Sequence, residues 1–529
     1  MWACPYVGSS FDRVLGLFYN QDLAGFDSNI SPSSKMGFGA AATLVLAAFI
    51  SCMLFIKAWR KTFQKGKLHP GPTPLPLVGN LLQVKGGEMV KSLLALRNTY
   101  GSVFTVHLGL RRVVVICGYE PLKEALIDHG DVFVARGGNP IFERMFHGYG
   151  VTISNGERWK KLRQFTVTTL RTFGMGKRGV EERIQEESEN FVNVLRDTKG
   201  AFSDPSPYLD YLSANVIFSI ILGTRFDFGD EKLNSLLRSS TEGFLLLSSI
   251  WGQLYEMYPG IMYYLPGPHN KLFKIFVGFE EFLMERVTEN QATLDVNSPR
   301  DFIDYYLIRK EQEKQNPLSE FHIQNLIPTL VDVVFGGVET VSTTVKYGLL
   351  MLLKHPAVEG KIQEEIDREI GQHRSPSYED RTKMPYTQAV VHEIQRFCDL
   401  LPMGVPHAVT CDILFRGYMI PKGTDVYPML TTALRDPTQF DEPENFNPGH
   451  FLDENGAFKK HKAFVPFSIG KRNCLGEGLA RMEIFLFLVT ILQNFKLKSP
   501  LDIKDIDLTP LETGIENVPR PFKIAFIPR

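Results

Sequence analysis

The chain has 529 residues, of which 44% are hydrophobic and 22% are charged, a composition typical of a globular protein. Lys and Arg number 58 and Asp and Glu number 59, so the net charge of -1 gives no basic excess for nucleic-acid binding. The six cysteines are scattered and form neither a C-x-x-C pair nor a zinc-like Cys/His cluster, which argues against a disulfide framework and indicates a reducing compartment such as the cytosol.

The first predicted element is a membrane anchor. Residues 36–56 form an uncharged run of 21 residues, long enough to cross a bilayer as a helix. Basic residues follow directly at Lys57, Arg60, Lys61, Lys65 and Lys67. Because basic residues gather on the cytosolic flank of a span, they predict a single-pass protein with its C-terminal body in the cytosol. The alternative, a cleaved signal peptide, fits less well because the run is long and the basic cluster lies on its wrong side.

Four regions are predicted along the chain. Residues 1–35 are a loop-like extension, either lumenal or a gene-model artefact, and residues 36–58 are the anchor. Residues 59–76 are a basic and proline-rich linker, which four prolines from Pro70 onward make stiff and extended. Residues 77–529 contain no second linker and no internal repeat, which predicts one large domain.

This domain is predicted to be mostly α, of the α+β class, with a large helical part and a small β-rich region. Residues 103–117 are β-rich and alternate, with a turn expected at Gly109-Leu110-Arg111-Arg112. Residues 356–371 predict a helix that begins at a proline, ends at a glycine and has three isoleucines on one face. Short strands are expected again around residues 409–427 and 520–528.

Two helical segments carry polar residues in suggestive places. Trp159 and Arg163 are spaced i, i+4 and so share a helix face, although a half-buried Trp beside a solvated Arg would look the same. Farther on, Phe335-Gly336-Gly337-Val338-Glu339-Thr340 interrupts an apolar helix with two glycines. Interior glycines cost about 1 kcal/mol each relative to alanine, so they suggest a close approach or a kink, or simply tight packing through small residues.

The segment Phe467-Ser468-Ile469-Gly470-Lys471-Arg472-Asn473-Cys474-Leu475-Gly476 is the strongest signal in the chain. It predicts a glycine-bearing loop that brings Cys474 to the start of a helix, where the helix dipole and free backbone N–H groups favour a thiolate. Gly470 and Gly476 would let the backbone approach a flat ligand, and Arg472 could pair with a carboxylate on it. A lone buried structural cysteine is the common alternative, but the joint spacing argues against it.

These segments together resemble the sequence motifs of the cytochrome P450 family. The sequence around Cys474 resembles that of the vertebrate microsomal family-two enzymes. The resemblance runs from about residue 36 to the C-terminus. It implies a helical fold with a small β region that encloses haem b (iron protoporphyrin IX). Cys474 would be the proximal iron ligand, whose thiolate favours O–O cleavage. The implied activity is that of a monooxygenase in the endoplasmic reticulum membrane.

The resemblance also assigns roles to single residues. Thr340 and Glu339 would be the oxygen-activating and proton-relaying pair, with Gly337 beside the haem. Val338 and Gly336 stand where Thr and Ala are usual, departures that bear on pocket shape. Propionate or haem contacts would come from Trp159, Arg163, His407, Arg472, Gly337, Phe467, Gly470 and Gly476.

A structural pair and a pocket are implied as well. Glu393 and Arg396, at i and i+3, would be a buried core pair that Pro448-Gly449-His450-Phe451 completes, with His450 where many relatives have Arg. An exposed helix pair would have the same spacing, as at Glu365 and Arg368. The implied substrate pocket is apolar and suits small lipophilic xenobiotics, steroids or fatty acids. Its expected walls include Phe142, Phe146, Phe244, Phe335, Leu401 and Met403.

The expected partner is the membrane-bound NADPH–cytochrome P450 reductase, with NADPH as the indirect electron source and cytochrome b5 as a further donor. A basic surface suited to an acidic donor is expected from Arg158, Lys160, Lys161, Lys459, Lys460, Lys462 and Lys471. Three other functions fit the same sequence less well: a haem-thiolate isomerase that needs no reductase, a non-catalytic membrane haem protein, and a haem-free membrane scaffold. NADPH-dependent turnover separates the monooxygenase from the first two.

Overall fold

The computed structural model describes residues 43, 45–47, 49–51, 53–54, 57, 68–85, 87–173 and 178–529. The predicted extension 1–35 and parts of the predicted anchor and linker lie outside the described residues. The chain divides into two units, Met1–Phe63 and Gln64–Arg529. Described residues of the first unit are helical and exposed. The second unit contains the cavity and the clusters described below.

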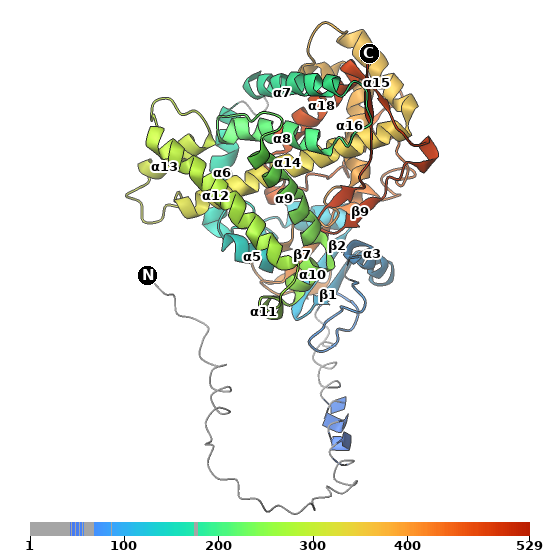
Figure 1. The fold of residues 1–529 in the computed structure, drawn as a ribbon. Coiled ribbons are helices and arrows are strands. Elements are labelled where there is room, and N and C mark those ends of the chain that lie inside the picture. Colours follow the sequence, from blue (N-terminus) through green and yellow to red (C-terminus); the bar gives the residue numbers. More distant parts are fainter. Residues whose placement is uncertain are drawn as a thin grey trace, which may run out of the picture. The chain divides into compact units, whose positions relative to one another are not determined.

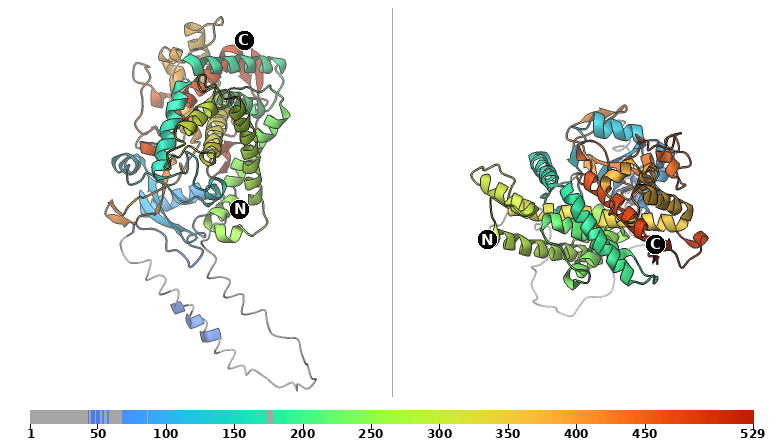
Figure 2. Two further views of the ribbon diagram at one scale, coloured as in Figure 1. Left: turned by 90° about the vertical axis from the view of Figure 1, so that its left-hand side faces the viewer. Right: turned by 90° about the horizontal axis from the view of Figure 1, so that it is seen from above.

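Helices make up most of the second unit, as Figures 1 and 2 show. They are α3 (Met89–Tyr100), α4 (Tyr119–Lys123), α5 (Pro140–Phe146), α6 (Gly156–Thr172), α7 (Arg178–Asp197), α8 (Ser206–Ile221), α9 (Glu231–Ser248), α10 (Ile250–Met257), α11 (Pro259–Met262), α12 (His269–Thr293), α13 (Phe302–Gln312), α14 (Ile323–Lys354), α15 (Pro356–Glu369), α16 (Pro385–Cys398), α17 (Thr431–Leu434) and α18 (Glu477–Asn494).

The strands form one sheet of five and three pairs. They are β1 (Val103–Leu108), β2 (Arg111–Cys117), β3 (Ala135–Arg136), β4 (His407–Ala408), β5 (Ile413–Phe415), β6 (Tyr418–Ile420), β7 (Asp425–Met429), β8 (Phe495–Lys498), β9 (Pro510–Thr513), β10 (Asn517–Pro519) and β11 (Ala525–Pro528). The large sheet has the order β1-β2-β7-β4-β3, in which only β2 and β7 are parallel. The mostly helical α+β class is therefore confirmed.

The β1–β2 hairpin departs from its prediction in two respects. Leu108 pairs with Arg111, so the turn is only Gly109-Leu110, and the two arginines begin β2. Gly109 has a φ of 62°, which suits glycine in a two-residue hairpin turn. All six residues of β1 are buried, so the strand is covered on both faces and does not follow the half-exposed alternation expected from the sequence.

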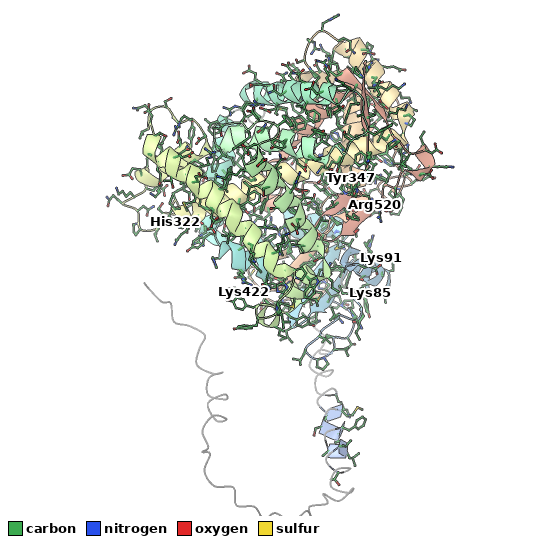
Figure 3. The ribbon with its side chains drawn as sticks, viewed as in Figure 1. Lys85, Lys91, His322, Tyr347, Lys422 and Arg520 are labelled. Atoms are coloured by element: carbon green, nitrogen blue, oxygen red, sulfur yellow. The ribbon has the colours of Figure 1, made fainter. Side chains whose placement is uncertain are left out.

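Helix α14 is the long central helix, and Figure 3 marks its course by His322, just before its first residue, and Tyr347 in its last third. Among the described residues it is the one helix long and apolar enough to cross a membrane, but 67% of its most apolar window is buried. It is therefore a core helix. Gly337 allows α8 to pack closely against it, since a Cβ there would lie 2.3 Å from Ile217 Cδ1.

The Glu393–Arg396 pair lies in α16, and both side chains are 0% exposed. Arg396 Nε and Nη2 each donate to the Glu393 carboxylate at 2.7 Å. The other guanidinium donors bind backbone carbonyls of Leu434, Pro443 and Asn445. Because every charged atom has a partner, the pair ties α16 to the segment that follows α17.

His450 completes this core cluster. Its Nδ1 lies 3.2 Å from Glu393 Oε2, and its Nε2 lies 2.6 Å from the carbonyl of Asp441. Burial tends to lower the pKa of His450, but the hydrogen bonds to Glu393 and Asp441 and the charge of Glu393 outweigh it, so the pKa is raised. Histidine thus supplies the third member of the charge network where arginine is more usual.

Candidate active site

One large cavity in the second unit brings together segments that are far apart in the sequence. It lies between α6, α14 and the loop before α18, with the segments around residues 136, 152 and 401–407 closing its sides. Nine residues predicted to serve cofactor or catalysis line it: Trp159, Arg163, Gly337, Thr340, His407, Phe467, Arg472, Cys474 and Gly476. Distant segments of the sequence therefore meet where the resemblance expects a flat cofactor.

Cys474 presents its thiol to this cavity. Its backbone N–H donates to the carbonyl of Phe467 at 2.9 Å, which closes the loop, and α18 begins three residues later at Glu477. The side chain is exposed, and the surface that it offers is that of the cavity. Burial raises the pKa of the Cys474 thiol, although the backbone N–H groups of Gly476 and Glu477 act in the opposite direction.

The two loop glycines serve different purposes. Gly476 lines the cavity next to the thiol, since a Cβ there would lie 3.9 Å from Cys474 Sγ. Gly470 is not among the lining residues; its φ is +79°, and a Cβ there would lie 2.0 Å from the carbonyl oxygen of Leu126. In this structure the close neighbour of Gly470 is the backbone of another loop, and its approach to the ligand stays a prediction.

Three arginines meet at one side of the cavity. Arg136, Arg163 and Arg472 all line it, and none has a carboxylate within ion-pair distance among the described residues. Burial, followed by repulsion from Arg136 and Arg163, lowers the pKa of Arg472 to about 8. Burial and repulsion from Arg163 also lower the pKa of Arg136, to about 10. Arg472 is buried and the other two arginines are half-buried. A cluster of such cations without an ion-pair partner suits an anionic ligand.

Backbone groups hold these arginines in place. Arg472 donates to the carbonyls of Val134 and Ser154 at 2.8 and 2.7 Å, and its guanidinium carbon lies 3.9 Å from the ring centre of Trp159. Arg163 donates to both the carbonyl and the side-chain oxygen of Asn473, the residue before the cysteine. Arg472 and Arg163 are thus tied to the loop that carries the thiol.

His407 joins this group in a neutral form. Its Nδ1 lies 2.7 Å from the carbonyl of Phe133, so Nδ1 carries the proton and Nε2 is the free acceptor. Burial, with repulsion from Arg136, lowers the pKa of His407 to about 3. It can therefore donate to a carboxylate only after a bound anion has favoured its protonation.

The residues present fit haem b. A cysteine thiol faces the cavity together with three unpaired arginines, so one wall offers an iron ligand and another offers partners for two propionates. Apolar side chains such as Val333, Val341 and Leu479 supply the remaining surface for a porphyrin. No group of three or more His, Cys, Asp or Glu residues able to hold a metal ion occurs in the described part of the chain.

Helix α14 meets the cavity along one face. Gly336, Gly337, Thr340 and Thr344 line it, and Thr340 Oγ1 donates to the carbonyl of Gly336 at 2.6 Å. A Cβ at Gly336 would have no atom within 4 Å, so a side chain there would extend into open space. Thr340 therefore keeps its hydroxyl oxygen available as an acceptor inside the cavity.

Glu339 does not line the cavity, although it precedes Thr340 in the chain. Successive helix residues are turned by about 100° from one another, and the Glu339 carboxylate points toward α9, where Thr241 Oγ1 donates to its Oε2 at 3.1 Å. Burial raises the pKa of Glu339 to about 7, while Lys346 acts in the opposite direction. The predicted acid is present but separated from the cavity.

Most of the predicted aromatic pocket lies outside the cavity lining. Leu401 lines the cavity, whereas Phe142, Phe146, Phe244 and Phe335 pack with one another and with neighbouring aromatic rings. Met403 is buried in the cluster around β1, β2 and β7. The assignment of these five residues to the substrate pocket stays a prediction, since apolar packing and pocket lining give the same sequence signal.

Arg136 and Asp332 also line the cavity, and neither was assigned a role from the sequence. Arg136 has its neighbours in other segments, at Thr152 and Val405, so no local pattern points to it. Asp332 accepts from the backbone N–H groups of Val151 and Thr152 at 2.8 and 2.9 Å and so fixes that loop to α14. A charged residue inside an otherwise apolar helix was the available signal for Asp332.

Several residues of the predicted basic surface are paired with carboxylates. Lys160 binds Glu157 at 2.7 Å, Lys462 binds Glu120 at 3.4 Å, and Lys471 binds Asp131. Arg158 pairs with Glu320 at 2.8 Å. Such exposed pairs are weak, so these side chains remain able to exchange partners with an acidic protein.

Arg472→Gln is expected to weaken haem retention by roughly ten- to hundred-fold, because a charge-assisted hydrogen bond contributes about 1.5–3 kcal/mol. Glutamine can still donate to the Val134 or Ser154 carbonyl, so the loop keeps part of its support. The measurement is the rate of haem transfer to excess apomyoglobin. Lys160→Gln, on the exposed side of α6 next to Trp159, is the control and should leave the rate unchanged. Equal rates in the two variants would argue against the cation cluster as the propionate site.

Comparison with known proteins agrees with this site. The family described as Cytochrome P450 matches residues 69–526. Cytochrome P450 2A13 of Homo sapiens is 53% identical over 492 residues, which cover 92% of this chain and 100% of that protein. Cytochrome P450 2A5 of Mus musculus is 52% identical, covering 91% and 98%, and Cytochrome P450 2G1 of Oryctolagus cuniculus is 51% identical, covering 93% and 100%.

Proposed function

Because this chain belongs to the cytochrome P450 family and is a haem-thiolate monooxygenase, we propose that Cys474 is its iron ligand and that substrates are oxidised beside Thr340. The observation that supports this most directly is the placement of one cysteine thiol and three uncompensated arginines on the walls of one cavity. Trp159, Arg163, His407, Arg472 and Arg136 are the proposed partners of the haem propionates.

Haem b held by Cys474 would supply the activation of O2, one atom of which is inserted into the substrate. The chain's own residues bind the haem, orient the substrate and exclude water. Arg136, Arg163 and Arg472 gain counter-charges when the propionates enter, which removes their electrostatic cost. Thr340 Oγ1, held by the Gly336 carbonyl, accepts a hydrogen bond from water or ligand in the cavity. The apolar face formed by Val333, Val341 and Leu401 favours lipophilic substrates.

Electrons reach a member of this family from a reductase partner. For this chain we propose the NADPH-dependent reductase of the endoplasmic reticulum membrane, with cytochrome b5 as a second donor. The uncharged run 36–56 and the basic residues after it support a single-pass anchor with the catalytic unit in the cytosol.

We expect the purified full-length chain, with reductase and NADPH in lipid vesicles, to hydroxylate or dealkylate members of a panel of lipophilic xenobiotics, steroids and fatty acids. Product should depend on both NADPH and O2 and should carry one labelled oxygen atom when ¹⁸O2 is supplied. Product from a peroxide substrate without reductase would instead indicate an isomerase. A correct spectrum with no product from any compound would indicate a non-catalytic haem protein.

A further inference from the structure

A group of largely buried charged side chains ties α10 to the large sheet, outside the cavity lining. Glu256 is the only charged residue of α10, and its Oε2 lies 3.5 Å from Nη1 of Arg111, the first residue of β2. Asp425 of β7 approaches the same guanidinium, with its Oδ2 3.5 Å from Arg111 Nε. The Tyr427 hydroxyl accepts from Arg111 Nη2 at 3.3 Å. One cation is therefore shared by two carboxylates that come from different elements.

The same charged group holds the backbone that leads into α5. The Gly138 N–H donates to Asp425 Oδ1 at 3.1 Å, and the Gly138 carbonyl accepts from Arg111 Nη1 at 2.6 Å. The Ile141 N–H, in the first turn of α5, donates to Glu256 Oε1 at 3.2 Å. A continuous series of contacts therefore joins α10, the start of α5 and the sheet.

The backbone held in this way runs between two stretches of cavity wall. Arg136 lines the cavity directly before it, and Val151 lines the cavity directly after it. Helix α10 packs against α5 within this stretch, and Figure 1 shows both helices at the same end of the second unit. We call residues 137–150 together with α10 the cover. Ile250 and Trp251 of α10 are exposed, so the cover offers apolar surface to a lipophilic molecule.

The contact between Arg111 and Glu256 is loose compared with a structural ion pair of the same protein. Arg396 and Glu393 are 2.7 Å apart and 0% exposed, whereas Arg111 and Glu256 are 3.5 Å apart and 22% and 14% exposed. Because water reaches this pair and its cation is shared, separating it costs less than separating a fully buried pair. The contact can therefore break and form again while the fold stays intact.

The titratable groups that face Glu256 determine when it is charged. Burial raises the pKa of Glu256 to about 7, and the charge of Arg111 acts in the opposite direction. Burial also raises the pKa of Asp425, and it raises the pKa of Tyr427 to about 12, which leaves the phenol neutral. On the α5 side, Arg144 donates to a hydroxyl group of α10 at 3.0 Å. The attraction between Arg111 and Glu256 is thus present above a pH of about 7 and weakens below it.

We propose that Arg111, Glu256 and Asp425 form a latch that holds the cover closed, and that bulky lipophilic molecules enter the cavity when Arg111 separates from Glu256. Asp425 competes with Glu256 for the guanidinium and so weakens the closed latch. Because the latch is closed both before and after a ligand has entered, it sets the rates of entry and exit and leaves the affinity unchanged. This inference rests on the proposed function and deepens it by naming residues that control the admission of substrate.

Two substitutions should change the rates in opposite directions. Glu256→Gln removes the charge that attracts Arg111, so the association and dissociation rates of phenyl isocyanide should each rise by roughly two- to five-fold, with an unchanged Kd. Asp425→Asn keeps an oxygen for the Gly138 N–H but removes the competing charge, so both rates should fall. A substitution that merely loosened the fold would raise the rates in both variants.

The rates are measured by stopped-flow absorbance on the reduced full-length protein, because the binding of phenyl isocyanide to haem iron shifts the Soret band. Carbon monoxide binds the same iron through carbon but is much smaller, so its association rate should be equal in wild type and variants. Glu242→Gln is the matched control. It removes a carboxylate that pairs with Lys271 at the surface, between α9 and α12, and should leave all rates unchanged.

The pH dependence gives a further test of the latch. In the wild type, the association rate of phenyl isocyanide should rise as the pH falls through about 7, because Glu256 then gains a proton and no longer attracts Arg111. Glu256→Gln should abolish this dependence.

Hydrogen exchange of backbone amides in the full-length protein tests the latch without the haem signal. Peptides that cover residues 137–146 and 250–257 should exchange faster in Glu256→Gln and slower in Asp425→Asn. Peptides from α16 should exchange at the wild-type rate in both variants.

Faster entry in both Glu256→Gln and Asp425→Asn, or equal changes for carbon monoxide and phenyl isocyanide, would overturn the latch. A changed Kd with only one altered rate would also overturn it, because the substitution would then act on the bound ligand. If neither molecule shifted the Soret band of the wild type, the proposed function would fall, and amide exchange alone would decide whether the cover is latched.

Discussion

Cys474→Ala is expected to abolish both the red-shifted Soret band of the reduced, carbon monoxide-treated protein and all NADPH-dependent product. The red shift requires a thiolate bound to the iron, and alanine supplies no ligand. The measurement is the difference spectrum of the full-length variant beside the wild type, with haem content determined separately.

The chain offers a demanding control, since a second cysteine also lines the cavity. Cys398 lies at the end of α16, is 4% exposed, and has its thiol 3.6 Å from the carbonyl of Gln395. Burial raises the pKa of Cys398 to about 12, which leaves it a thiol. Cys398→Ala should therefore keep the red-shifted band. If the band survived in Cys474→Ala and vanished in Cys398→Ala, the assignment of the iron ligand would have to be reversed.

Arg396→Met is expected to destabilise the folded protein by about 3–5 kcal/mol, because it leaves the buried Glu393 without its guanidinium partner. It also leaves the carbonyls of Leu434, Pro443 and Asn445 without a donor. Large cofactor proteins do not unfold in two states, so the measure is the temperature at which half of the carbon monoxide band is lost. That temperature should fall by several degrees.

Arg368→Met is the matched control for this variant. Glu365 and Arg368 have the same i, i+3 spacing, but Arg368 is 59% exposed and its nearest Glu365 oxygen is 3.8 Å away. Exposed pairs contribute about 1 kcal/mol or less, so its midpoint should stay close to wild type. Equal losses in the two variants would show that the effect comes from shortening an arginine on a helix and not from a buried charge.

The sequence predicted those features whose signal is local. The Cys474 loop, the long helix with its paired glycines and the helix from Pro356 all follow from spacing within one segment. The Glu393–Arg396 pair was separable from Glu365–Arg368 only by its order along the chain, because burial arises from neighbours nearly 40 or more residues away.

Where the observed surroundings of a residue differ from the expected ones, the difference has a physical cause. Glu339 is adjacent to Thr340 in sequence, but the turn of the helix sends its carboxylate to a different neighbour. Met403 and Phe335 carry the apolar signal of a pocket wall, and that signal is the same for apolar side chains that pack against one another, as both do here. Arg136 lies in no local pattern, since its neighbours come from other segments of the chain.

The paired glycines of α14 differ in how much space a side chain would have at each position. A Cβ at Gly337 would lie 2.3 Å from the terminal methyl of Ile217, so substitution there requires that side chain of α8 to shift. A side chain at Gly336 meets nothing and would simply occupy cavity space. A lineage, or an engineer, can therefore change the size of molecule that this enzyme admits by graded substitutions at position 336, at little cost to folding. The range of substrates that fit can therefore change at position 336, while Gly337 preserves the close packing of α8 against α14.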